Sequence, residues 1–155
     1  MNIAKSPTKS LIAQDILTQH QDLHSQLMAL RFDDGFLPRL LRETGWTVEQ
    51  CDRTIQEYRR FLFLHRTASH TVIPSQMVDK VWHLHLLYTR SYWEDLCDNI
   101  LKTPLHHHPG SATGDQRDFF WGNYEATLKS YETTFHQAPP TDIWPSPARQ
   151  FAPPK

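Results

Sequence analysis

Apolar residues recur every three or four positions along most of the chain, which is the spacing of one face of an α-helix. Strict alternation of apolar and polar residues, the pattern of a half-buried strand, is nearly absent, and leucine outnumbers valine and isoleucine. Only five glycines interrupt the pattern. The sequence therefore predicts an all-α fold.

About five helices follow from this periodicity and from the residues that begin and end helices. The predicted spans are residues 10–32, 36–43, 47–67, 76–101 and 115–135. Ser10, Thr47 and Asp115 are the predicted N-caps, and Thr47 with Gln50 has the spacing of a capping box. Gly45 ends the second helix. The span 76–101 is apolar on nearly all sides, so we expect it to be the central helix of a single bundle.

The C-terminal segment has a different composition. Six of the eleven prolines lie within residues 138–155, and proline cannot occupy the interior of a helix. We therefore expect a helical domain at residues 1–137 and an extended, proline-rich tail at 138–155. Trp144 lies between prolines of this tail, and we expect it to be buried against the helices.

Charge and hydropathy exclude several classes of partner. Sixteen basic and seventeen acidic residues give a net charge of -1, and no basic block is present that would favour nucleic acid. No run of apolar residues is long enough to cross a membrane, and the N-terminus does not resemble a secretory signal. These features predict no nucleic-acid or membrane partner and a cytoplasmic location.

Histidine is the residue type that suggests chemistry, because five of the ten histidines lie in two short segments, 78–93 and 103–110. Asp79 and His83 are four residues apart and share one face of a helix, so both can reach one ion. His83 and His85 are about 200° apart around the helix axis. A regular helix cannot direct both at one ion. His85 lies on an apolar face, where it is either a ligand or a hydrogen-bonded core residue.

The second histidine segment is a short loop in which His106, His107 and His108 stand between Pro104 and Pro109. Adjacent side chains cannot all point the same way, so one or two of these histidines should face the domain. His83 would lie roughly 27 Å from the end of a helix that reaches residue 101. Either the loop folds back or the helix breaks if the two segments are to meet.

Four stretches together resemble the bacterial relatives of the plant glycine-rich domain-containing proteins. They are DKVWHLHLLYTRSY, PLHHHP, YEATLKSY and PPTDIWP, within residues 74–145. The resemblance implies a mostly helical domain and supplies no reaction. The residues that match its pattern are Asp79, Trp82, His83, His85, His106 and His107. This chain lacks the glycine-rich segment of the plant proteins.

The favoured hypothesis is a histidine-rich, metal-binding helical domain. Its candidate ligands are Asp79, His83, His85, His106 and His107. Imidazole nitrogen with one carboxylate oxygen suits zinc, iron, copper or nickel. An open coordination position would make the domain a metal-dependent enzyme, although no motif of nucleophilic catalysis names a reaction. The alternative is a non-catalytic helical interaction module with structural histidines, and a protein or small-molecule partner is compatible with both.

Overall fold

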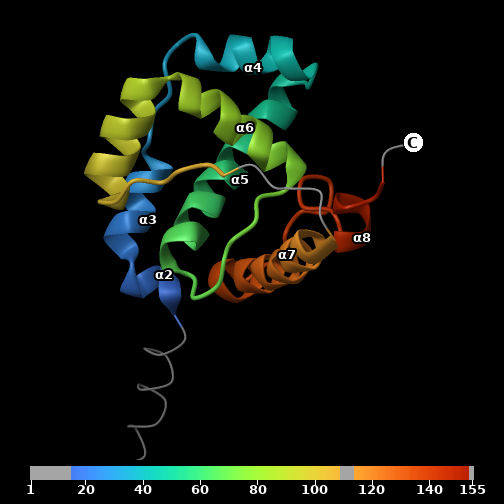
Figure 1. The fold of residues 1–155 in the computed structure, drawn as a ribbon. Coiled ribbons are helices and arrows are strands. Elements are labelled where there is room, and N and C mark those ends of the chain that lie inside the picture. Colours follow the sequence, from blue (N-terminus) through green and yellow to red (C-terminus); the bar gives the residue numbers. More distant parts are fainter. Residues whose placement is uncertain (1–14, 109–113, 154–155) are drawn as a thin grey trace, which may run out of the picture.

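The computed structural model describes residues 15–108 and 114–153, and in these ranges every regular element is a helix (Figure 1). The predicted all-α class is therefore confirmed. The predicted caps at Ser10 and at the Asp115 side chain fall outside what is described. The elements are α2 (Ile16–Gln19), α3 (Gln21–Met28), α4 (Phe36–Thr44), α5 (Val48–Thr67), α6 (Gln76–Leu87), η1 (Arg90–Leu101), α7 (Gly114–Phe135) and α8 (Pro147–Gln150).

The central helix is α5, which packs against α3, α4, α6 and α7 (Figure 1). It begins as predicted: Thr47 Oγ1 accepts from the Gln50 amide at 3.1 Å, and Gln50 Oε1 accepts from the Thr47 amide at 2.9 Å. Residues 61–64 are all buried in succession, which requires neighbours on every side of the helix. The expectation that residues 76–101 form the central helix was wrong, because α6 exposes the face that carries Lys80, His83 and Leu87.

The predicted helix 76–101 is two elements. α6 ends before Tyr88, whose φ of -93° and ψ of 74° leave the helical region, and the π-helix η1 follows. Side chains bridge the break: Trp82 Nε1 donates to the Tyr92 hydroxyl at 2.8 Å. The break turns the chain so that η1 packs against α3 and α6. Apolar spacing alone does not show such a break, because both elements present apolar positions to the same core.

The predicted helix 10–32 is also shorter and interrupted in its described part. His20, with φ -120° and ψ 40°, separates α2 from α3, and α3 ends at Met28. Beyond this end Arg59 Nη2 donates to the Leu30 carbonyl oxygen at 2.8 Å. A side chain of α5 thus donates a hydrogen bond to a backbone carbonyl just past the end of α3.

The C-terminal tail packs on the helices, and Trp144 is only 2% exposed, as predicted. The tail is not extended throughout, because residues 147–150 form α8. Pro147 occupies the first turn of α8, where the missing N–H removes no helical hydrogen bond, and Ser146 caps the helix. The proline content of the tail therefore excludes a long helix there, but it allows a short helix that begins at a proline.

None of the described helices is both long enough and apolar enough to cross a lipid bilayer.

Candidate metal centre

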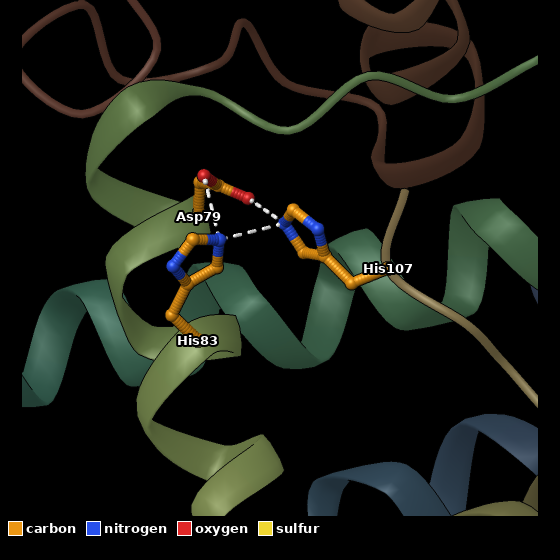
Figure 2. Close-up of side chains that lie close together, drawn as sticks. All are labelled: Asp79, His83 and His107. Atoms are coloured by element: carbon orange, nitrogen blue, oxygen red, sulfur yellow. Dashed lines mark hydrogen bonds and ion pairs between the residues drawn. The ribbon is translucent and has the colours of Figure 1, made fainter. Parts of the chain in front are cut away.

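Side chains of Asp79, His83 and His107 converge on one point at the surface of α6 (Figure 2). His107 Nε2 lies 2.6 Å from Asp79 Oδ1 and 3.0 Å from His83 Nε2. His83 Nε2 lies 3.5 Å from Asp79 Oδ2. The two histidine segments that the sequence singled out therefore meet, through one histidine of each.

The local structure of α6 explains the placement of Asp79 and His83. Ser75 caps the helix, with its Oγ accepting from the Val78 amide at 3.2 Å. Asp79 then lies in the first turn, where the helix dipole favours a carboxylate. Val78 and Val81 are fully buried on the opposite face, so Asp79 and His83 point away from the core.

Buried hydrogen bonds hold the His107 segment against α6. The Tyr92 hydroxyl donates to the Leu105 carbonyl oxygen at 2.6 Å while it accepts from Trp82 Nε1. Lys102 has a φ of 60°, which reverses the chain after η1. The Trp82 ring then lies 4.3 Å from the His107 ring, centroid to centroid. The helix break and the folded-back loop, offered by the sequence as alternatives, both contribute.

With Asp79 ionised, the three polar contacts cannot all be favourable among the side chains alone. An Nε2 atom carries either a proton or a lone pair, and a carboxylate only accepts. If His107 Nε2–H donates to Asp79, neither state of His83 Nε2 fits. Without a proton, its lone pair faces the carboxylate. With a proton, that proton faces the proton of His107. If His107 is unprotonated at Nε2, its lone pair faces the carboxylate at 2.6 Å. A bound cation removes this conflict, since all three atoms can donate lone pairs to it.

The separations also match the ligand spacing around one small ion. Ligand atoms about 2.1 Å from a metal lie about 3.0 Å apart at octahedral right angles and about 3.4 Å apart in a tetrahedron. The observed separations of 3.0 and 3.5 Å are close to these values, and the 2.6 Å between His107 and Asp79 is shorter than either. The side chains of His83, Asp79 and His107 are 60%, 34% and 16% exposed, so an ion could enter from solvent.

His85 lies in the core and away from the cluster. Its Nδ1 is 2.7 Å from the Tyr58 hydroxyl and its Nε2 is 2.9 Å from Ser91 Oγ. Burial lowers the pKa of His85 to about 3, which keeps the ring neutral. The sequence left two roles open for His85, a metal ligand or a hydrogen-bonded core residue. Because both of its nitrogens are hydrogen-bonded in the core, His85 has the second role.

The structure also separates the loop histidines. His106 faces Trp93, with ring centroids 5.3 Å apart, and its side chain is exposed. Among the described residues, His107 is the member of this loop that joins the cluster of ligand atoms. His106, expected beside His107, is therefore not brought to the same point.

Sequence reasoning missed the positioning role of Trp82 and Tyr92. Both are buried, with Trp82 6% exposed and Tyr92 0% exposed. The available signal was that a buried indole N–H needs an acceptor. Which acceptor it finds depends on the turn between α6 and η1, which the sequence did not show.

The fold and the cluster together define a small all-α domain with a surface group of two histidines and one carboxylate. The model of the UCP032817-like family matches residues 22–122, well over half of the chain. The chain therefore belongs to the UCP032817-like family, and the matched segment contains all three residues of the cluster. Comparison with curated proteins and with solved structures gave no significant match.

Proposed function

We propose that this domain binds one divalent transition-metal ion through Asp79, His83 and His107. The observation that carries the proposal is the convergence of three donor atoms, all within 4.8 Å of one another, from two separate segments of the chain. Their contacts conflict without a cation, and their separations suit one small ion. The folded-back loop places His107 there through buried hydrogen bonds of its own.

The donor set narrows the choice of metal. Two imidazole nitrogens and one carboxylate oxygen suit zinc, iron(II), copper or nickel better than magnesium or calcium, which prefer all-oxygen sites. Three protein ligands leave at least one position for water or another molecule, as in catalytic zinc sites and in two-histidine, one-carboxylate iron sites. Activation of a bound water or substrate is therefore the enzymatic role that we propose for the site.

The alternative, a non-catalytic interaction module, draws less support. A C-terminal tail that is free to bind a partner would favour this alternative. Trp144 is instead buried in the domain itself, where its Nε1 donates to Glu57 Oε1 at 3.0 Å. Release of the tail to a partner would expose this indole and leave a buried carboxylate with one donor fewer.

The relation to the plant glycine-rich domain-containing proteins stays a hypothesis. The residues that carry the resemblance include the three proposed ligands. They also include Trp82, which packs on His107, and His85, which is hydrogen-bonded in the core. A shared metal site would give a physical reason for this pattern of residues.

Metal binding by untagged protein tests the proposal directly. Wild-type protein titrated with zinc or cobalt(II) should bind one equivalent. The His83→Ala, His107→Ala and Asp79→Asn variants should each lose affinity by about 100-fold or more, because a three-ligand site depends on every donor. The matched controls are His106→Ala and His108→Ala, which remove exposed imidazoles of the same loop and should bind like wild type.

Untagged protein that takes up none of zinc, copper, nickel or iron(II) at micromolar concentration would contradict the proposal. Equal losses in the His108→Ala control and in the ligand variants would contradict the assignment of residues.

A further inference from the structure

A cleft of about 740 Å³ opens directly beside the proposed metal site. Asp79 and His107 form part of its wall, whereas His83 lies on the other side of the cluster. A metal held by the three ligands would therefore border this cleft. The volume lies within the range typical of small-molecule sites.

The exposed surface of the wall is largely apolar, and its apolar residues come from three parts of the fold. They are Val72, Ile73, Pro74, Trp82, Phe119 and Phe120. Three further histidines, His65, His106 and His108, and several hydroxyl and amide side chains complete the wall. Phe119 is 49% exposed although it is a large apolar side chain. An exposed aromatic ring beside a concave apolar surface is typical of a ligand site.

Hydrogen bonds fix this wall in place before any ligand binds. The Ile73 amide donates to Thr127 Oγ1 of α7 at 3.0 Å. Gln76 Nε2 donates to the Gln150 carbonyl oxygen at 2.8 Å, which ties α8 to the start of α6. A preformed apolar wall lowers the ordering cost of binding a small molecule.

The charge of the cleft indicates what kind of molecule fits. Asp79 is the one acidic residue among the described lining residues, none of which is lysine or arginine, and the other titratable groups are the imidazoles of His65, His106, His107 and His108. With these imidazoles neutral, a divalent ion combined with the Asp79 carboxylate leaves one net positive charge at the edge of a largely apolar space. A single negative charge with an apolar body complements this arrangement, and carboxylate oxygen is a suitable ligand for the metals in question.

We propose that the cleft binds a small aromatic monocarboxylate, with its carboxylate on the metal ion and its ring against Ile73, Phe119 and Phe120. This inference rests on the proposed metal site. It adds the class of molecule that occupies the open coordination position. Such a molecule is the substrate class that the site would act on.

Cobalt(II)-loaded protein provides a direct test, because the visible spectrum of cobalt(II) responds to a new oxygen ligand. The probes are phenylacetate, acetate and phenylethanol, titrated separately and followed by absorbance and calorimetry. Phenylacetate should change the cobalt spectrum and bind at least about tenfold more tightly than acetate, which lacks the ring, or phenylethanol, which lacks the charge.

Two matched variants test the apolar wall. Phe119→Ser should weaken phenylacetate binding by about tenfold, since the ring loses apolar contact, and should leave cobalt binding unchanged. Val48→Ser removes another apolar side chain, 53% exposed and outside the cleft, and should change neither.

The outcomes separate the two proposals. Cobalt that binds through the three ligands, with a spectrum that phenylacetate alters no more than acetate does, overturns the inference and leaves the metal site standing. Phenylacetate binding that is equally tight without cobalt, or no tighter than that of phenylethanol, overturns carboxylate coordination. Failure of wild-type protein to bind cobalt, zinc, copper, nickel or iron(II) overturns the metal site and this inference together.

Discussion

At the scale of single residues, His83 and His85 of α6 have opposite environments. His83 is 60% exposed in its side chain and belongs to the ligand cluster. His85 is fully buried, and both of its nitrogens are hydrogen-bonded. Two positions along a helix are about 200° around its axis, which accounts for this division of roles.

The burial of His85 predicts a specific loss of stability in acid. Its pKa in the folded protein is lowered from 6.5 to about 3, so between these values the unfolded chain binds one proton that the native protein does not. The free energy of unfolding should therefore fall with falling pH below about 6, by about 1.4 kcal/mol per pH unit from this residue.

Urea unfolding of chelator-treated protein at several pH values measures this effect without a contribution from metal. His85→Gln, which has no titrating ring, should show a slope that is smaller by about one proton. Identical slopes for the variant and wild type would show that His85 titrates normally in the folded state.

At the scale of elements, the break between α6 and η1 builds the site. It allows Tyr92 to accept from Trp82 and to donate to the Leu105 carbonyl, and so it fixes the segment that carries His107. A continuous helix through residue 101 would carry the loop far from His83. The irregularity of the helix is therefore what joins the two histidine segments.

Tyr92→Phe should weaken metal binding although Tyr92 is not a ligand. Loss of the hydroxyl leaves Trp82 Nε1 and the Leu105 carbonyl without this partner, which costs about 1–3 kcal/mol of stability. His107 loses its fixed position as well, so we expect metal affinity to fall about 10- to 100-fold in a zinc titration.

Tyr131→Phe is the control for this variant. It removes another buried hydroxyl, which donates to Glu57 Oε1 at 2.7 Å away from the site. We expect a comparable loss of stability with unchanged metal affinity. If Tyr92→Phe binds metal as tightly as Tyr131→Phe does, then Tyr92 stabilises the fold without positioning His107.

At the scale of the whole molecule, a buried carboxylate connects the tail to two helices. Glu57 of α5 is 7% exposed and accepts hydrogen bonds from Tyr131 of α7 and Trp144 of the tail. Arg60 Nη1 lies 3.6 Å from Glu57 Oε2 and balances its charge. These hydrogen bonds hold the tail against the helices, where it covers part of the core.

Deletion of residues 139–155 should therefore lower the melting temperature, by on the order of 10 °C, because it uncovers the Trp144 site and leaves Glu57 with fewer donors. Thermal unfolding followed by circular dichroism measures this change. Asp142→Asn is the control. This substitution breaks an exposed ion pair with Arg53, which contributes little to stability, so we expect almost no change in the melting temperature. An unchanged melting curve after the deletion would show that the tail does not stabilise the domain.

Several features could be predicted from the sequence because they depend on residues within one or two helical turns. The all-α class follows from apolar spacing, and the start of α5 from the Thr47 capping box. The end of α4 follows from Gly45, which adopts a φ of 75°. The pairing of Asp79 with His83 follows from their spacing on α6.

Only the tertiary structure decided which other residues join them. The choice of His107 over His106 depends on the hydrogen bond from Tyr92 of η1 to the Leu105 carbonyl. The core role of His85 depends on its hydrogen bonds with Tyr58 of α5 and Ser91 of η1. These bonds join residues that local periodicity treats as independent. The sequence by itself therefore determined the all-α class and two of the three residues of the cluster. The packing of separate segments determined where the helices break and which histidine completes the cluster, because buried polar groups must find partners wherever the folded chain places them.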